Sequence, residues 1–150
     1  MNEDFAAYNF ESLCKVLSPP MQNAMQSEIA KLKQMGKMEW KSHGQSSKTK
    51  ILHAVMGKTP AQTQDIYQFT MELNYNQAVA LYREKKNGQK ELVAGDPNKI
   101  VPIREYIVFE RIISYKDNSR KPEVKSYGHW RIAGKLEYKP KEGKAAKTIQ

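Results

Sequence analysis

The fold is decided by the stretch from Ile103 to Tyr138, which begins IREYIVFERII (residues 103–113) and resumes after a polar connection as VKSYGHWRIAGKL (residues 124–136). The first part is rich in β-branched and aromatic residues and has no internal Gly or Pro, which favours a central strand. In the second part apolar residues alternate with basic ones, which predicts one buried face. The apolar set is Trp130, Ile132 and Leu136, and the basic set is Arg131 and Lys135. Turn-forming residues at 117–122 separate the parts, so we expect a long antiparallel pair.

Composition limits the class of protein. The 150 residues suit one domain with a single core, and the formal net charge is +9. This charge favours a polyanionic partner, either nucleic acid or an anionic membrane surface, with a basic protein lacking such a partner as the alternative. The single cysteine, Cys14, fits a reducing compartment. The acidic start resembles neither a secretory signal nor an Arg-rich transit peptide, so we expect a targeting segment to be absent or already removed.

Two amphipathic helices are expected before the sheet. Apolar residues between Phe5 and Val16 recur every three to four positions, with Asn2 or Asp4 as the cap. A second helix is predicted from Pro20 to about Met35, because Ser18 and the prolines favour its start and Gly36 favours its end. Its apolar stripe consists of Met21, Met25, Ile29 and Leu32. We interpret the methionines as core filling, with a surface for nascent apolar helices as the alternative.

Several strands are predicted after Trp40, which opens an irregular stretch and a loop at residues 43–47. The next strand is expected at 49–56, with Ile51, His53 and Val55 on one face. Residues 65–75 alternate cleanly between apolar and polar side chains, as in a half-buried antiparallel strand. We then expect a reversal at 74–77, a strand at 78–83, a tight hairpin at Asn87-Gly88, a short edge strand at 91–94 and a turn at 95–98.

Helices followed by five or six antiparallel strands predict an α+β fold. The N-terminal helices would pack on a strongly curved antiparallel sheet and give a cone. We predict a single domain over residues 1–138 and a mobile basic tail over residues 139–150.

The sequence contains no recognisable catalytic or metal-binding pattern. Its histidines are scattered, and it lacks a zinc-protease motif, a phosphate-binding glycine loop and a nucleophile elbow. Glu110 could act as a base inside the fold, but we favour a place at the surface or beside a neighbouring arginine. We therefore predict no enzyme activity, cofactor, metal or small-molecule substrate. The candidates for phosphate or headgroup contact are Lys48, Lys50, Lys139, Lys141, Lys144 and Lys147.

Three segments together resemble a known family. They are MELNYNQAVALY (71–82), EYIVFER (105–111) and HWRIAGKL (129–136). They are similar to the mitochondrial inner-membrane ribosome receptor of fungi, to the related tunnel-exit large-subunit mitoribosomal protein of animals, and to the C-terminal domain of the presequence-translocase motor anchor. The resemblance covers roughly residues 10–136. Its signature residues are Tyr106, Phe109, Glu110, Arg111, Trp130, Arg131 and Gly134.

The resemblance implies a nuclear-transport-factor-2-like domain without catalysis, held peripherally on the matrix side of the mitochondrial inner membrane. Its partners would be the rRNA and exit-site proteins of the mitochondrial large subunit, the membrane surface, the insertase and nascent chains. It would align the ribosome exit site with the insertion machinery for co-translational insertion. The long loop at 116–125 and the basic tail favour the fungal branch. Two alternatives stay open: an intrinsic mitochondrial large-subunit ribosomal protein, and a small-molecule-binding or catalytic cone-fold protein.

Overall fold

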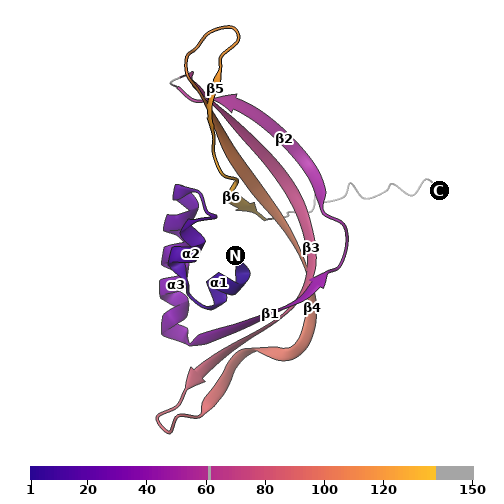
Figure 1. The fold of residues 1–150 in the computed structure, drawn as a ribbon. Helices are drawn as coiled ribbons and strands as arrows, with labels where there is room; N and C mark the ends of the chain where they lie inside the picture. Colours follow the sequence, from indigo (N-terminus) through magenta and orange to yellow (C-terminus); the bar gives the residue numbers. More distant parts are fainter. Residues whose placement is uncertain (61, 138–150) are drawn as a thin grey trace, which may run out of the picture.

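The computed structural model describes residues 1–60 and 62–137. In this part of the chain, three helices precede six antiparallel strands that form one sheet. The helices are α1 (Asn2–Ala6), α2 (Phe10–Cys14) and α3 (Pro19–Met35). The strands are β1 (Lys37–Gln45), β2 (Lys50–Lys58), β3 (Gln64–Glu84), β4 (Lys90–Tyr115), β5 (Val124–Tyr127) and β6 (Arg131–Leu136). Figure 1 shows the helices on the concave side of a bent sheet. The α+β class is confirmed, while the cone stays a prediction.

Two very long strands, β3 and β4, form the centre of the sheet. β1 and β2 share the outer edge of β3, with β2 beside residues 65–72 and β1 beside residues 75–82. β5 and β6 share the outer edge of β4. The predicted antiparallel pair is therefore confirmed, although residues 128–130 divide its second half into two strands.

β3 corrects the prediction of a chain reversal at residues 74–77. The strand is unbroken, and within it Tyr75 and Gln77 pair with Ile103 and Val101 of β4. Neither Gly nor Pro interrupts this stretch, and partner strands satisfy its backbone groups. Strand pairing therefore overrides the turn preference of asparagine, and the two strands predicted around the reversal are one strand.

β4 contains a bulge where a turn was predicted, at residues 95–98. Gln77 of β3 pairs with Val101 of β4, whereas Val79 pairs with Asp96, so β4 carries extra residues between these positions. Gly95 adopts a φ of +78°, and a Cβ there would lie 2.1 Å from the carbonyl oxygen of Val79. Only glycine fits this conformation and this approach, so the chain bends without reversing.

The hairpin predicted at Asn87-Gly88 is confirmed and joins β3 to β4. Gly88 has a φ of +77°, and the amide of Lys85 donates to the carbonyl oxygen of Gln89 over 2.8 Å. Asn87 does not have a positive φ, so the loop is not the two-residue turn with positive φ at both positions that Asn-Gly favours. The amide of Gly88 donates to the Lys85 carbonyl over 2.9 Å, and Gly88 alone supplies the left-handed residue of a longer loop. The short strand predicted at 91–94 is the beginning of β4.

The first amphipathic segment forms two short helices, not the single helix predicted. Tyr8, between α1 and α2, has a φ of +56°, which lies outside the right-handed helical region. α2 begins after Asn9, whose side chain accepts the amide of Ser12 over 3.2 Å. Neither predicted cap is used, because Met1 occupies the N-cap of α1. The second helix is confirmed: α3 follows Ser18 and ends before Gly36.

Trp40 lies in a regular strand, which corrects the predicted irregular stretch. Met38 and Trp40 are half-buried and the residues on either side of them are largely exposed, as period-two alternation requires. The loop predicted at 43–47 is shorter, because β1 extends to Gln45.

A bulge at Leu52 changes the faces predicted for β2. The register on β3 shifts between Ile51 and His53, which makes Leu52 the extra residue. Ile51 therefore shares a face with Ala54 and Met56, and not with His53 as simple alternation predicted.

A second shift, at Ala133, overturns the faces predicted for β6. The register on β4 changes between Ile132 and Gly134, which inserts one residue. Ile132 is buried in the core as predicted, but Leu136 lies on the convex side and is half-exposed, while Lys135 lines a concave pocket. A slip of one residue moves all later side chains to the opposite face, which is why the prediction fails after Ile132.

The core lies between the helices and the middle of the sheet. It consists of Leu13, Leu17, Ile29, Ile107 and Ile132. The segment joining α2 to α3 runs beside β6: the amide of Ile132 donates to the Val16 carbonyl over 2.7 Å, and the amide of Ser18 donates to the Ile132 carbonyl over 2.9 Å. This small core leaves both ends of the long sheet beyond the helices, as Figure 1 shows.

Candidate functional site

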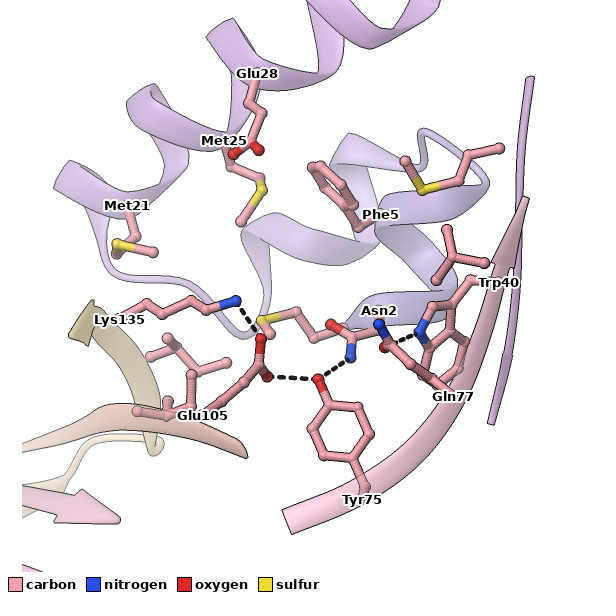
Figure 2. Close-up of a pocket in the computed structure, with 15 residues that line it drawn as sticks. Asn2, Phe5, Met21, Met25, Glu28, Trp40, Tyr75, Gln77, Glu105 and Lys135 are labelled. Atoms are coloured by element: carbon pink, nitrogen blue, oxygen red, sulfur yellow. Dashed lines mark hydrogen bonds and ion pairs between the residues drawn. The ribbon is translucent and has the colours of Figure 1, made fainter. Parts of the chain in front are cut away.

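A pocket of about 220 Å³ lies between the helices and the concave side of β3 and β4 (Figure 2). Its walls are mainly apolar and include Phe5, Met21, Met25, Val79, Ile107 and Ile132. The volume is below the range of about 300–1,000 Å³ that is typical of small-molecule sites. Met21 and Met25 of α3 pack against the core, as predicted, and also form one wall of this pocket, whereas Met35 at the end of the helix is 48% exposed.

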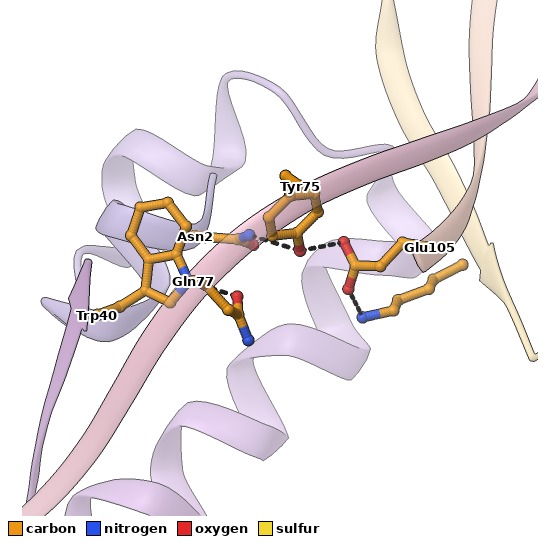
Figure 3. Close-up of polar contacts among 6 residues, drawn as sticks. Asn2, Trp40, Tyr75, Gln77 and Glu105 are labelled. Carbon is orange, nitrogen blue, oxygen red and sulfur yellow. Dashed lines mark hydrogen bonds and ion pairs between the residues drawn. The ribbon is translucent and has the colours of Figure 1, made fainter. Parts of the chain in front are cut away.

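A chain of four polar side chains lies along one side of the pocket (Figures 2 and 3). The Asn2 side-chain amide donates to the Tyr75 hydroxyl over 3.0 Å, and that hydroxyl donates to Glu105 Oε2 over 2.6 Å. Lys135 Nζ pairs with the other carboxylate oxygen, Glu105 Oε1. Both oxygens of a largely buried carboxylate are therefore satisfied, and its charge is compensated.

Each of these four polar side chains comes from a different helix or strand. Asn2 opens α1, Tyr75 lies in the middle of β3, Glu105 in β4 and Lys135 in β6. Lys135 reaches the concave side only because of the extra residue at Ala133. The site thus depends on the register of the sheet as well as on the residue types.

The hydroxyl of Tyr75 is held as a proton donor. Burial, followed by the hydrogen bond to Glu105 and the charge of that carboxylate, raises the pKa of Tyr75 above its usual range. The phenol therefore stays protonated at neutral pH and orders the carboxylate beside it.

Trp40 adds a second polar contact at the pocket. Its indole Nε1 donates to Gln77 Oε1 over 2.7 Å, which joins β1 to β3. Gln77, which the sequence placed in a reversal, is therefore the partner that fixes the indole ring.

The pocket offers apolar walls and two carboxylates: Glu105, which is already engaged, and Glu28 of α3, which is exposed. Tyr75 and Lys135 both contact Glu105, and no histidine is among the described lining residues. Within residues 1–60 and 62–137, no three His, Cys, Asp or Glu side chains are placed to hold a metal ion. None of the described helices has both the length and the apolar character needed to cross a bilayer.

A second polar cluster lies on the convex face around Glu72 and includes one predicted phosphate-contacting lysine. Asn74 Nδ2 donates to Glu72 over 3.0 Å, and Arg104 Nε donates to Asn74 Oδ1 over 3.1 Å. Lys50 Nζ lies 3.8 Å from Glu72. The hydrogen bond from Asn74, with the nearby charges of Lys50 and Arg104, lowers the pKa of Glu72. Part of the charge of Lys50 is thereby neutralised.

The other predicted lysines are placed only in part. Lys48 lies exposed between β1 and β2 and forms no ion pair with a described residue. The remaining four, Lys139, Lys141, Lys144 and Lys147, lie outside the described residues with the rest of the predicted tail. That these six lysines contact phosphate or lipid headgroups stays a prediction.

Arg111, one of the signature residues, joins β4 to the connection between β5 and β6. Its guanidinium lies over the rings of Tyr127 and Trp130, 5.2 and 5.8 Å from their centroids. Arg111 Nε also donates to the carbonyl oxygen of Gly128 over 2.8 Å. Trp130 in turn meets Phe69 with the ring centroids 5.4 Å apart. Arg111 and Trp130, both signature residues, thus hold the connection between β5 and β6 against this end of the sheet.

Trp130 itself is 43% exposed, which corrects the prediction that it faces the core. It precedes β6 and stacks at the end of the sheet, so the alternation of that strand does not apply to it. Phe109, another signature residue, is partly buried against the core.

The remaining signature residues have structural contacts. The Tyr106 hydroxyl donates to Glu72 over 3.4 Å, and Glu110 accepts Gln68 Nε2 over 2.7 Å on the convex face. Glu110 therefore lies at the surface as favoured, but its hydrogen-bond partner is a glutamine. On β6, Arg131 is exposed and Gly134 lies opposite Val108.

The polar chain at the pocket was missed from the sequence. Asn2, Tyr75, Glu105 and Lys135 are spread over more than 130 residues and form no motif. The alternation predicted for residues 65–75 puts Tyr75 on the same face as Leu73, which does pack against the core, and this was the one signal that pointed inward.

The comparison with protein families matches residues 2–136 to the Tim44-like domain. A search among curated proteins finds no significant match. The Tim44-like domain has a nuclear-transport-factor-2-like fold and indicates a role associated with the mitochondrial membrane, together with translocase or ribosome components. Because the match spans nearly the whole chain, this protein belongs to the Tim44-like domain family.

Proposed function

We propose that this domain is a non-catalytic adaptor that holds the mitochondrial ribosome at the matrix side of the inner membrane. It would align the exit site of the large subunit with the insertase, so that nascent membrane proteins insert during synthesis. The match of residues 2–136 to the Tim44-like domain carries the proposal. The resemblance of the segments 105–111 and 129–136 to the fungal receptor favours a ribosomal partner over the translocase.

Basic residues would supply the contact with the ribosome. The chain has 25 Lys and Arg residues against 16 Asp and Glu residues, and its predicted contacts are the lysines at 48, 50, 139, 141, 144 and 147. Lysines that bind rRNA phosphates displace counterions, so the affinity falls steeply as salt is added. Acidic surfaces of exit-site proteins would be recognised through the same charge.

The hairpin end of β3 and β4 supports a membrane contact. This end extends past the helices in Figure 1 and exposes apolar side chains together with lysines. They are Leu92, Val93 and Ile100, with Lys86 and Lys99. Apolar groups flanked by basic groups favour anionic lipid surfaces, at about 1 kcal/mol per basic residue near the surface.

Co-sedimentation with purified mitochondrial ribosomes tests the proposal. The bound fraction should fall sharply between about 50 and 200 mM salt. Deleting residues 139–150 should weaken binding, whereas replacing the four tail lysines with arginine should preserve it. Salt-independent binding that survives the deletion would refute the role of the tail, and absence of binding at every salt concentration would refute the receptor.

Flotation with cardiolipin-containing liposomes separates the receptor from an intrinsic ribosomal protein. The receptor should float without ribosomes, whereas an intrinsic subunit should stay at the bottom of the gradient.

The concave pocket favours a second candidate function, binding of a small molecule. Its apolar walls and the ordered pair of Tyr75 and Glu105 are the observation in its support. Native mass spectrometry of the purified protein distinguishes the candidates: a stoichiometric bound molecule would favour the binder, and the bare chain mass would favour the adaptor.

A further inference from the structure

The outer edge of β2 has no partner strand among the described residues. β2 pairs with β3 on one side only, and Figure 1 shows it along the margin of the sheet. After the bulge at Leu52, its register on β3 is continuous from His53 to Lys58, which gives a regular edge six residues long. The unpaired backbone N–H and C=O groups of such an edge are a template for another strand.

The side chains along this edge are apolar on both faces. Ile51 and Met56, on the concave side, are 63% and 61% exposed, and Leu52 and Val55, on the convex side, are about half exposed. Exposed edges are usually protected by proline, by short length or by charges within the strand. β2 has no proline, and its charged side chains are confined to its two ends, Lys50 and Lys58.

Charge selects among the possible occupants. Residues 46–64 contain three lysines and no Asp or Glu. A second copy would bring three more lysines and no Asp or Glu to the same edge, and like charges brought together across a strand pair are destabilising. The lysine-rich C-terminal tail of this chain would meet the same repulsion. A strand with acidic ends would instead meet lysine at both ends of the edge. Lys50 is 66% exposed, but Glu72 at 3.8 Å offsets part of its charge. Lys48 and Lys58 form no ion pair with a described residue, so they are the free charges that flank the edge.

We propose that β2 docks an extended segment of a partner protein, with apolar residues at alternate positions and acidic residues at its ends. The segment would add to the sheet as a strand beside residues 53–58. Main-chain hydrogen bonds would give affinity, while the apolar alternation and the terminal carboxylates would set the register. This inference goes beyond the proposed function, because the docking requires neither a ribosome nor a membrane.

Titration of the full chain with a synthetic peptide tests the proposal by nuclear magnetic resonance. The probe is Asp-Asp-Val-Thr-Val-Thr-Val-Asp-Asp, which combines the required alternation and charge. Within residues 53–58, the alternate amides that point away from β3 should become protected from hydrogen exchange. N-methylation of the peptide at alternate residues on its bonding edge should lower the affinity at least about tenfold, since several backbone hydrogen bonds are lost together. Equal binding of the methylated peptide would overturn the proposal.

A second experiment reverses the charges that flank β2. In Lys48→Glu with Lys58→Glu, the preference should change from the Asp-flanked peptide to its Lys-flanked counterpart, by about two- to fivefold per charge pair. Lys86→Glu with Lys99→Glu, at the hairpin end of β3 and β4 away from the residues 65–72 that pair with β2, is the matched control and should keep the original preference. An unchanged preference in the first variant would overturn the proposal. Protection of 53–58 without peptide, together with a dimer in sedimentation velocity, would assign the edge to a second copy and would also overturn it.

Discussion

Replacing Tyr75 with phenylalanine should destabilise the fold by removing the middle of the polar chain at the pocket. The ring remains, so apolar packing is conserved. Two hydrogen bonds are lost: the 3.0 Å bond from Asn2 and the 2.6 Å bond to Glu105. Glu105 keeps its ion pair with Lys135 but loses its only hydroxyl donor among the described residues.

The expected loss of stability is set mainly by the hydrogen bond from Tyr75 to the charged carboxylate of Glu105. A hydrogen bond to a charged group contributes about 1.5–3 kcal/mol, and partial exposure together with the remaining lysine reduces this. We expect a loss of about 1–2 kcal/mol in the free energy of unfolding. With a urea m value of about 2 kcal/mol per molar, the midpoint should fall by about 0.5–1 M.

Urea unfolding followed by tryptophan fluorescence measures this loss. Tyr127→Phe is the matched control, because the hydroxyl of Tyr127 bonds no described residue and the ring stacked on Arg111 is retained. The control midpoint should stay within about 0.2 M of the original, as expected for an exposed substitution.

The pH dependence gives a second readout. The pKa of Tyr75 is raised in the folded state, whereas an unfolded tyrosine ionises near about 10. Above that pH the unfolded chain releases a proton that the folded chain keeps, so stability falls as pH rises. The contribution of Tyr75 is therefore complete below about pH 10 and declines above it. The phenylalanine variant should lose stability less steeply above pH 10. A midpoint equal to that of Tyr127→Phe, with an unchanged alkaline slope, would refute the reasoning.

Three further tests, two of them with a reference substitution, address other features of the fold. Gly95→Ala should cost at least about 2 kcal/mol in urea unfolding, because of both positive φ and backbone overlap, whereas Gly44→Ala, with positive φ in open space, should cost about 1 kcal/mol. Trp130→Ala should lower the free energy of unfolding by about 1–2 kcal/mol, because the ring is partly exposed. Ile107→Ala should lower it by about 2–5 kcal/mol, because Ile107 is fully buried. The pKa of Glu72 is lowered in the folded protein, whereas a glutamate in the unfolded chain has a pKa of about 4.3. The ionised carboxylate therefore stabilises the fold above about pH 4.3, and this stabilisation is lost as the pH falls. Glu72→Gln should make the decrease in unfolding free energy below that pH less steep.

Local patterns predicted the elements whose ends are set by local chemistry. Ser18 and Gly36 bracket α3, and Asn87-Gly88 forms the hairpin, because proline, glycine and asparagine act on the backbone directly. The alternation of residues 65–75 likewise identified the first half of β3. These features need no knowledge of distant parts of the chain.

Bulges and long-range pairing account for most of the errors. One extra residue at Ala133 exchanges the faces of Lys135 and Leu136, and alternation carries no sign of it. Tyr75 looked like part of a turn because asparagines flank it, yet pairing across both edges of β3 kept the strand continuous. The hydrogen-bonded polar side chains at the pocket meet only in these registers, so their contact could not be predicted before the sheet was known.

Site-specific crosslinking to mitochondrial ribosomes tests the central claim most directly. A photoreactive group placed at Lys48, which is exposed between β1 and β2, should crosslink to rRNA or proteins at the tunnel exit of the large subunit at low salt, and the yield should fall as salt is raised. Crosslinks confined to translocase subunits, with none to the ribosome at any salt concentration, would contradict the account.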